Sequence, residues 1–285
     1  MIDFPLKKEN FSALLLIFLI SLFVGFCFYQ QSLLFPKLKV TFFDIQGESS
    51  LIQLPGGIDI LIDGGEENDL CYELEKELPF FDKKVDYIFL SHPEKDHLEG
   101  LFCVLDFYEV DEIFIGDFPQ KSFLFEKFLK KAKKEGVKVE KLSAGDMIEF
   151  PFGGKIFVLW PPQKCIFDNF NDCSLVFLFL FGKEKILFTG DISERVEKIL
   201  EFNYGFKVDL LKVAHHGSKY SSSPDFLKKF SPQMAVIIAS KNDEYHPSQR
   251  VIETFKREKI KTFITKKDGK IKFFSYGDSL EIVSP

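Results

Sequence analysis

The chain has 285 residues, of which 46% are hydrophobic and 28% are charged, so it can bury a large core and is not a disordered tail. Its formal net charge of -6 excludes recognition of a nucleic acid by bulk positive charge alone. Its five cysteines are odd in number and include no Cys-x-x-Cys pair, which argues against a disulfide framework or a thiolate metal site. We therefore expect most of the cysteines to be small buried side chains.

Residues 11–29 form an uncharged apolar run. About 20 apolar residues span a bilayer as a helix, and no small-x-small site follows the run, which favours an uncleaved anchor over a signal peptide. We expect residues 1–9 to be a short tail, residues 10–31 a single transmembrane anchor and residues 38–285 one domain. Lys7 and Lys8 precede the run, which favours an extracytoplasmic location for the domain.

Apolar alternation and turn residues predict a domain that begins with strands and continues with alternating strands and helices. Strands are predicted at 40–45, 51–54, 58–62, 85–90, 112–116, 137–142, 147–150, 155–159, 174–181, 185–188, 208–213, 261–265 and 270–274. Helices are predicted at 67–78, 98–108, 122–135, 194–202, 225–230 and 248–259. This order fits two central sheets flanked by helices.

Three of the predicted strands end in side chains that can bind a metal. They lead into Ser91-His92-Pro93-Glu94-Lys95-Asp96-His97, into Thr189-Gly190-Asp191 and into Ala214-His215-His216-Gly217-Ser218. Such loops can direct several imidazoles and carboxylates to one point, as a metal site requires. One such cluster alone is commonly the start of a helix, but three in a fixed order favour a metal site.

These loops, together with further motifs, resemble the metallo-β-lactamase superfamily, and within it the soluble domain of the ComEC/Rec2 competence proteins. The further motifs are Phe43-Asp44-Ile45, Gln46-Gly47-Glu48-Ser49, Leu61-Ile62-Asp63-Gly64-Gly65, Asn171-Asp172-Cys173-Ser174-Leu175-Val176 and His246-Pro247-Ser248. The resemblance begins near Lys39 and implies an α/β fold, a four-layer αββα sandwich, here preceded by the transmembrane helix. It also implies a metal site at one edge of the sandwich.

The resemblance also implies roles for individual residues. The metal ligands would be His92, Glu94 in place of a second histidine, Asp96, His97, Asp191, and one of His215 and His216, with His215 preferred. Because carboxylates are frequent in this set, one or two divalent ions are expected, with Mn²⁺ or Zn²⁺ favoured and Mg²⁺ as a third candidate.

Other residues are expected around these ligands. Asp96 would also orient the attacking water, and His246 would contact phosphate or protonate the leaving group unless it is a solvated loop residue. Supporting positions are expected at Asp44, Asp63, Asn171 and Asp172, although Asp44 and Asp63 could equally be turn caps. Substrate contacts are expected at Ser218, Lys219 and Lys212.

Phosphodiester hydrolysis, with DNA as the substrate, is the leading prediction, and the choice of DNA depends on the resemblance. The alternatives are a metallohydrolase of a small ester, lactone or cyclic nucleotide, and a non-catalytic membrane-tethered binding domain. Competence proteins carry this domain beside a many-helix channel, so a separate channel subunit is an expected partner, besides DNA and the membrane. The sequence leaves the oligomeric state open.

Overall fold

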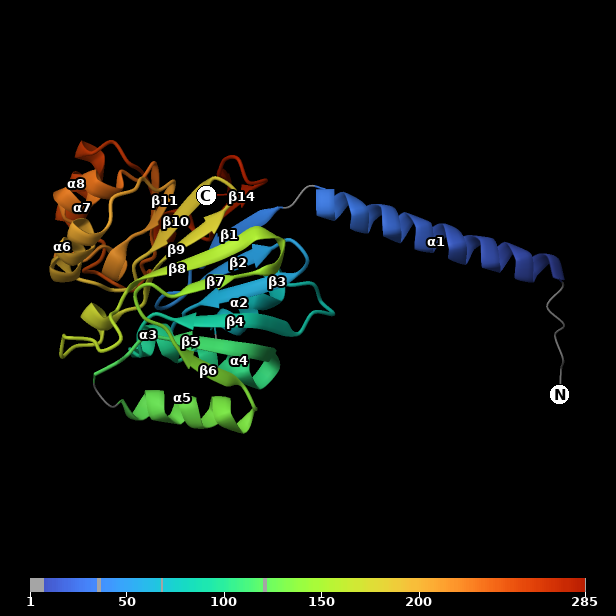
Figure 1. Ribbon diagram of the computed structural model, residues 1–285, viewed down its shortest axis with the longest axis horizontal. Coiled ribbons are helices and arrows are strands. Elements are labelled where there is room, and N and C mark those ends of the chain that lie inside the picture. The colour runs from blue at the N-terminus through green and yellow to red at the C-terminus, as the bar shows by residue number, and fades with distance from the viewer. Residues whose placement is uncertain (1–7, 35–36, 68, 120–121, 285) are drawn as a thin grey trace.

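The computed structural model describes residues 8–34, 37–67, 69–119 and 122–284, with the backbone only for 8–12, 27–34 and 284. Two β-sheets form the centre of the domain (Figure 1). The eight-stranded sheet has the order β15-β14-β1-β2-β3-β4-β5-β6, and the seven-stranded sheet has the order β13-β12-β11-β10-β9-β8-β7. The fold is therefore mixed α/β with two sheets, as the sequence predicted.

The strands have the following bounds. The first sheet contains β1 (Leu38–Phe42), β2 (Ser50–Leu54), β3 (Ile58–Ile62), β4 (Lys84–Leu90), β5 (Glu109–Ile115), β6 (Lys138–Lys141), β14 (Ile271–Ser275) and β15 (Glu281–Ser284). The second contains β7 (Met147–Glu149), β8 (Gly154–Trp160), β9 (Val176–Phe181), β10 (Glu184–Phe188), β11 (Leu210–Lys212), β12 (Met234–Ile237) and β13 (Lys261–Ile264).

Helices cover the outer faces of both sheets. The described helices are α1 (Lys8–Leu34), α2 (Asp69–Glu77), α3 (Lys95–Leu98), α4 (Leu101–Phe107), α5 (Phe123–Lys134), α6 (Glu194–Asn203), α7 (Pro224–Phe230), α8 (Gln249–Arg257) and α9 (Thr265–Asp268), with single 3₁₀ turns at Pro151–Gly153, Asn171–Cys173 and Ala214–Gly217. Buried residues of α2, α4 and α5 pack on the first sheet, and those of α6, α7 and α8 pack on the second.

Phenylalanine fills the space between the two sheets. Phe42 and Phe273 from the first sheet meet Phe177 and Phe188 from the second, and the rings of Phe177 and Phe188 stack with centroids 5.0 Å apart. Buried aromatic rings remove a large apolar area from water. The inter-sheet core therefore contains part of the 36 phenylalanines of the chain. Its packing holds the two sheets together, and the ligand loops lie at one edge of this sandwich.

The end of the chain is divided between the two sheets. The strands predicted at 261–265 and 270–274 lie in different sheets, as β13 and β14, with α9 between them. The sequence analysis did not identify β12 or β15. The sequence of β12 is Met-Ala-Val-Ile and that of β15 is Glu-Ile-Val-Ser, so neither alternates between apolar and polar positions.

The expectation about the cysteines was wrong, because Cys71 forms a disulfide with Cys103 and Cys165 forms one with Cys173. Their Cα atoms are 6.3 and 5.8 Å apart, within the usual range for a bridge. The first pair joins α2 to α4, which are far apart in sequence and become neighbours only in the fold. Sequence spacing alone could not reveal that pairing.

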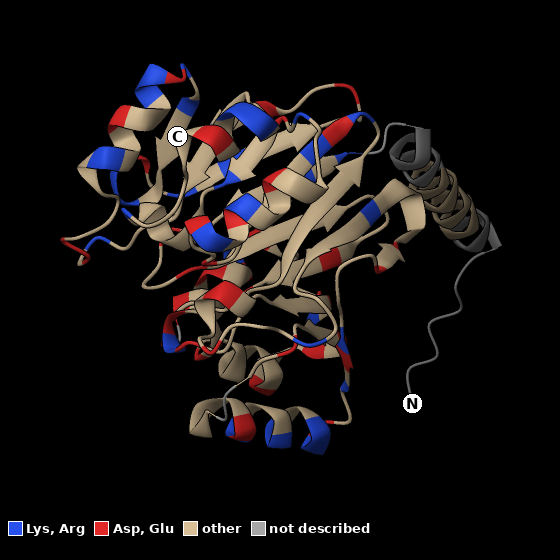
Figure 2. Ribbon diagram, turned by 60° about the vertical axis from the view of Figure 1, so that its left-hand side comes forward, with Lys and Arg blue, Asp and Glu red and all other residues tan. Residues whose placement is uncertain are grey.

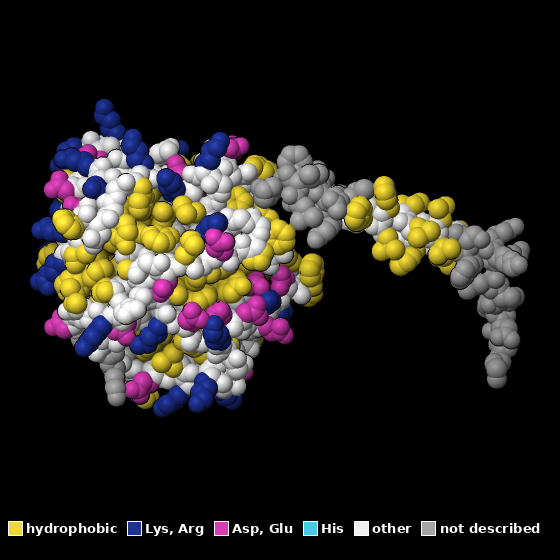
Figure 3. Space-filling model, in the orientation of Figure 1, with side chains coloured by type: hydrophobic (Ala, Val, Ile, Leu, Met, Phe, Trp, Pro, Cys, Tyr) yellow, Lys and Arg dark blue, Asp and Glu magenta, His cyan; other side chains and the backbone are white. Residues whose placement is uncertain are grey.

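Helix α1 extends away from the two sheets (Figure 1), and the large hydrophobic side chains described along it are exposed (Figure 3). Among the described residues, no helix is both long and apolar enough to cross a membrane. Side chains in this helix are described only for residues 13–26. Both ends of the predicted anchor at 10–31 lie outside them, so the anchor stays a prediction.

Candidate metal centre

Four side chains from three loops converge at one point on the edge of the sandwich. Asp96 and His97 begin the short helix after β4, Asp191 follows β10, and His216 follows β11. His216 Nε2 lies 3.1 Å from Asp96 Oδ2 and 3.5 Å from Asp191 Oδ2, while His97 Nε2 lies 3.4 Å from Asp191 Oδ2 and 3.8 Å from Asp96 Oδ2. We call these four residues the four-donor position.

The spacing within the four-donor position fits a metal ion. Ligands at about 2.1 Å from a tetrahedral ion lie roughly 3.4 Å from one another, close to the 3.1–3.8 Å found between these atoms. His97 Nε2 and Asp191 Oδ1 are also buried without a hydrogen-bond partner. Buried polar atoms rarely lack partners, so an ion at this point would account for donors that otherwise carry a cost.

Hydrogen bonds from behind aim both imidazoles at this point. His97 Nδ1 lies 2.9 Å from Asp63 Oδ2, and Asp63 also accepts hydrogen bonds from the backbone N–H and hydroxyl of Ser91, at 2.7 Å each. His216 Nδ1 lies 3.0 Å from the carbonyl oxygen of Ile238. With each Nδ1 engaged, Nε2 is left to face the ion. Asp63, which the sequence suggested as a supporting residue or a turn cap, thus contacts the His97 ring from behind the four-donor position.

The charges at this point shift the pKa values as expected where negative charge attracts cations, protons among them. Burial lowers the pKa of His97 and His216, but nearby carboxylates outweigh it. Those of Asp191 and Asp63 hold the pKa of His97 well above its usual value, and those of Asp191 and Asp96 raise the pKa of His216 to about 9. Burial would raise the pKa of both carboxyl groups, but the neighbouring imidazoles hold each well below its usual value. Two carboxylates therefore stay ionised and attract positive charge.

A buried ion pair behind the four-donor position was missed by the sequence analysis. Lys212 pairs with Glu48, donates a hydrogen bond to the carbonyl of Gly190 at 3.0 Å and lies 3.6 Å from Asp191 Oδ1. Glu48 is close enough to His97, Asp191 and His216 to share an ion with them. However, it faces the Nδ1 side of His216, at 3.5 Å, and its charge is paired with Lys212. Glu48 therefore supports the site from behind.

The sequence carried a signal for Glu48, because this residue lies in the Gln46-Gly47-Glu48-Ser49 motif. Gly47 has a φ of 82°, and a Cβ atom there would lie 2.2 Å from the backbone oxygen of Asp96. Only glycine lets this loop approach the ligand loop so closely. Lys212, by contrast, was predicted to contact substrate, but only 1% of its side chain is exposed. Its burial leaves no surface for such a contact.

A second group of donors lies beside the first but is less complete. His92 Nε2 is buried without a partner, 3.9 Å from Glu94 Oε2, and the Glu94 side chain is 43% exposed. Burial and the neighbouring His97 hold the pKa of His92 well below its usual value, so its imidazole is neutral. Asn171 Oδ1 is also buried without a partner. We call the pair of His92 and Glu94 the two-donor position.

His215 and His246 lie at the rim of the centre. His215 Nε2 is 4.0 Å from Asp191 Oδ2, and its ring stacks on that of His246 with centroids 5.7 Å apart. His246 Nδ1 lies 2.7 Å from Asp243 Oδ2. From the sequence, His215 was preferred over His216 as the ligand. The geometry favours His216, because its Nε2 lies 3.1 Å from Asp96 Oδ2 and 3.5 Å from Asp191 Oδ2.

The remaining predicted site residues are spread more widely. Asp172 is buried and accepts a hydrogen bond from the backbone N–H of Ser193 at 2.9 Å. Asp44 pairs with Lys241 at 2.7 Å, away from the four donors. Ser218 is buried, and its hydroxyl accepts from the backbone N–H of Tyr220 at 3.4 Å. Lys219 is exposed at the edge of a pocket.

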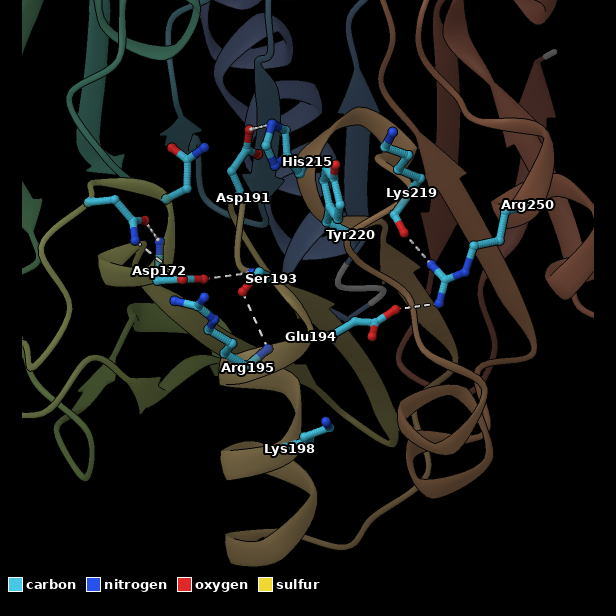
Figure 4. Close-up of a pocket in the computed structure, with 12 residues that line it drawn as sticks. Asp172, Asp191, Ser193, Glu194, Arg195, Lys198, His215, Lys219, Tyr220 and Arg250 are labelled. Atoms are coloured by element: carbon cyan, nitrogen blue, oxygen red, sulfur yellow. Dashed lines mark hydrogen bonds and ion pairs between the residues drawn. The ribbon is translucent and has the colours of Figure 1, made fainter.

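Two pockets open beside the four-donor position. A pocket of about 640 Å³, which we call the basic pocket, contains Asp191 and His215 (Figure 4). Its other charged lining residues are Asp172, Glu194, Arg195, Lys198, Lys219 and Arg250. A pocket of about 520 Å³, which we call the acidic pocket, contains Asp96 and His216. Its other charged lining residues are Glu66, Lys95, Asp243 and Glu244.

The lysine-rich surface from Lys127 to Lys141 is less suited to a polyanion than its sequence suggests. Lys131 pairs with Asp106 at 2.5 Å, Lys138 with Glu112 at 2.5 Å, and Lys141 with Asp117 at 2.7 Å. In the view of Figure 2, acidic residues lie among the basic ones along the ribbon. These pairs already neutralise much of the positive charge there.

No protein-family model matches the chain. It is similar to ComE operon protein 3 of Bacillus subtilis, with 30% identity over 197 residues covering 67% of this chain and 25% of that protein. It is also similar to Recombination protein 2 of Haemophilus influenzae, with 29% identity over 280 residues covering 96% of this chain and 32% of that protein. The chain thus spans about a quarter to a third of these relatives.

Solved structures share the fold at low sequence identity. The metallo-β-lactamase fold protein YhfI from Bacillus subtilis matches 80% of this chain and 96% of its own, with a TM-score of 0.52 and 15% identity. Zn²⁺-bound PqqB from Methylobacterium extorquens matches 77% of this chain and 85% of its own, with a TM-score of 0.52 and 10% identity. These likenesses identify the fold of the domain.

Proposed function

Because this chain is a homologue of the competence proteins and has the metallo-β-lactamase fold, we propose that it is a metal-dependent hydrolase of phosphodiesters. The observation that carries the proposal is the convergence of Asp96, His97, Asp191 and His216 at the spacing of metal ligands. DNA is the proposed substrate, by analogy with the names of the relatives, Recombination protein 2 and Competence protein ComA.

A divalent ion held by the four-donor position would activate a water molecule near neutral pH and stabilise negative charge on a phosphoryl oxygen. Mn²⁺ and Zn²⁺ are the proposed ions, and Mg²⁺ is the third candidate, because two carboxylates and two imidazoles suit all of them to different degrees. A second ion would use His92 and Glu94. The Zn²⁺-bound relative by fold supports zinc among these choices.

The chain itself would supply orientation and proton transfer. Asp96 Oδ2 faces the shared point of the four donors and can accept a hydrogen bond from the attacking water. His246 is held by Asp243 through Nδ1 and stacks on His215 at the rim. We propose that its other nitrogen protonates the leaving oxygen as the P–O bond breaks.

The test combines metal analysis with hydrolysis assays. The whole chain, purified without chelators, should carry at least about one ion per chain and cleave labelled single-stranded DNA when Mn²⁺ is supplied. Asp96→Ala and Asp191→Ala should abolish cleavage. Cleavage that survives both changes would indicate a contaminating nuclease. DNA binding without turnover would favour the non-catalytic binding domain, and turnover of an ester, lactone or cyclic nucleotide alone would favour the other alternative.

We also propose three features that the sequence predicts. These are the membrane anchor at 10–31, the extracytoplasmic location of the domain, and a separate channel subunit as partner. The relatives contain two thirds or more of sequence that this chain does not match. Co-purification of the tagged chain with a multi-helix membrane protein from its native host would support the channel subunit.

A further inference from the structure

The two pockets beside the four-donor position differ in charge. Asp191, in the lining of the basic pocket, and Asp96, in the lining of the acidic pocket, both face His216 Nε2, at 3.5 and 3.1 Å. The two pockets therefore meet at the same point. A substrate that extends to both sides of the metal would enter two different electrostatic environments.

The carboxylates of the basic pocket are already engaged. Glu194 pairs with Arg250, Asp172 accepts a hydrogen bond from the backbone N–H of Ser193, and Asp191 belongs to the four-donor position. Arg250, in α8, also donates a hydrogen bond to the carbonyl oxygen of Lys219 at 2.6 Å. Together with its ion pair to Glu194, at the start of α6, this bond joins the loop at Lys219 to both helices. Arg195, Lys198 and Lys219 are therefore the cations of this pocket that are left to meet a ligand.

Arg195, Lys198 and Lys219 supply the positive charge that faces solvent in the basic pocket. All three are exposed, and the first two lie on the first turns of α6. In Figure 4, Lys198 lies at the opposite end of the pocket from Asp191 and His215. This separation leaves room for a phosphate beyond the one that is bound at the metal.

An aromatic side chain stands beside these cations. Tyr220 lines the basic pocket, is 64% exposed, and has the Lys219 ammonium 5.0 Å from its ring centroid. Aromatic rings next to cations are how proteins hold single-stranded nucleic acids, since each base can stack on a ring while phosphates meet the cations.

The acidic pocket offers the opposite environment. Glu66, Asp243 and Glu244 line it, and its lysine, Lys95, already pairs with Glu66 and with Glu99 at 3.4 Å. Glu66 pairs with Lys95 and Asp243 with His246, so a second phosphate placed there would meet the exposed carboxylate of Glu244 and no free ammonium group among the lining residues. A carboxylate repels a phosphate, since both are negatively charged. The acidic pocket therefore disfavours a polyanion.

From this asymmetry, and resting on the proposed function, we propose that the substrate is a single strand whose further phosphates all lie in the basic pocket. Arg195, Lys198 and Lys219 contact those phosphates, Tyr220 stacks against a base, and the acidic pocket receives a leaving part that carries no phosphate of its own. The reaction is hydrolysis: a water oxygen bonds to phosphorus, the bond from phosphorus to the leaving sugar oxygen breaks, and that oxygen takes a proton. The strand is therefore cleaved near one end.

Dinucleotides with one extra phosphate test the asymmetry directly. Thymidine dinucleotide is compared with forms that carry a further phosphate on the 5′ end or on the 3′ end, using the whole chain with Mn²⁺. One phosphorylated form should be hydrolysed about 10-fold faster than the parent, as expected for one added phosphate contact worth about 1.4 kcal/mol. The other form should be no faster. If both forms are accelerated, or neither is, the proposal is overturned.

Substitutions assign the effect to the basic pocket. Lys198→Gln should remove most of the acceleration, and it should lower the salt dependence of kcat/KM by about 0.7 in the logarithmic slope. Lys130→Gln is the matched control, because Lys130 is also an exposed lysine on a helix but lies in neither pocket. An equal effect of both changes would mean that only general surface charge matters, which overturns the proposal.

A substrate without a second phosphate separates this proposal from the proposed function. Bis(p-nitrophenyl) phosphate should be hydrolysed by the unaltered chain and, at an equal rate, by the control variant Lys130→Gln. If no phosphodiester is hydrolysed at all, the proposed function fails. If bis(p-nitrophenyl) phosphate is hydrolysed but no dinucleotide gains from a further phosphate, the proposed function stands and the one-sided strand contact fails.

Discussion

The four-donor and two-donor positions lie side by side and differ in completeness. The four-donor position has buried imidazoles held from behind by Asp63 and Ile238, and it brings two carboxylates within 3.1–3.8 Å of them. The two-donor position has one buried imidazole and a carboxylate that is 43% exposed, 3.9 Å away. Preorganised donors bind an ion without paying to order side chains first. We therefore expect the two positions to fill in sequence, the four-donor position first.

The largest effect is expected at Asp191, because its carboxylate lies 3.4 Å from His97 Nε2 and 3.5 Å from His216 Nε2 in the four-donor position. Asp191→Ala should remove bound metal and reduce hydrolysis by more than the roughly 10- to 100-fold that loss of a supporting partner costs. Metal content by mass spectrometry and kcat/KM are the measurements. A variant that keeps its full metal content would show that the four donors do not act together.

The two neighbouring histidines provide the next test. His216→Ala should lower metal affinity by more than about 100-fold, whereas His215→Ala should lower it by less than about 10-fold. The reason is that His216 Nε2 lies within 3.5 Å of both carboxylates, while His215 reaches only Asp191, at 4.0 Å. Competition with a chelating dye measures both affinities. The reverse order would make His215 the ligand.

Proton release should also distinguish the two positions. In the metal-free chain the pKa of His216 is about 9, so at pH 7 an ion must displace its proton, whereas His92 is already neutral. Affinity at the four-donor position should therefore rise with pH up to about 9. Calorimetry in buffers of different ionisation enthalpy would count the protons released. A metal affinity that does not change between pH 7 and about 9 would contradict the assignment of His216 as a ligand.

The same pKa predicts how the metal-free chain responds to pH. The pKa of His216 is raised from 6.5 to about 9 by folding, so the stability it contributes is fully present below pH 6.5 and is lost as the pH rises through 9. The contribution is on the order of 3 kcal/mol. Thermal unfolding with a chelator should show this fall, and added metal should reverse it. A chelated His216→Gln variant should lose the trend.

The smallest effect is expected from completing the two-donor position. Glu94→His restores a second imidazole beside His92 and should raise the bound metal from about one to about two ions per chain at equal metal concentration. Glu94→Gln is the control and should stay at one ion. If Glu94→His leaves the metal content unchanged, the weakness of this position has another source than its second ligand.

Much of this centre could be predicted from the order of motifs along the sequence. Asp96, His97 and Asp191 follow apolar strands, and the resemblance to the metallo-β-lactamase superfamily implied that they meet at one edge of the sandwich. The choice between His215 and His216 could not be made, because adjacent residues differ only in side-chain direction. Both adopt positive φ values, 51° and 52°, which periodicity does not anticipate.

The fold was predictable where strands are long and was not where contacts are distant in sequence. The disulfide between Cys71 and Cys103 and the pair of Glu48 and Lys212 join residues separated by 32 and 164 positions. Lys212 resembled a surface cation in the sequence, and only the packing of the second sheet against the loop at Glu48 buries it. Pairings of this kind depend on tertiary structure, which single-sequence patterns do not report.

The two disulfides also determine in which compartment the chain can reach its final folded state. The Cys165–Cys173 bridge closes the segment that carries Asn169, Asn171 and Asp172, which is a wall of the basic pocket. Such bonds form and persist where an oxidant is available, and thiol reductants in most cytosols prevent them. Maturation outside a reducing compartment would thus fix this wall, and protein recovered from a reducing host should have looser substrate contacts until its thiols are oxidised.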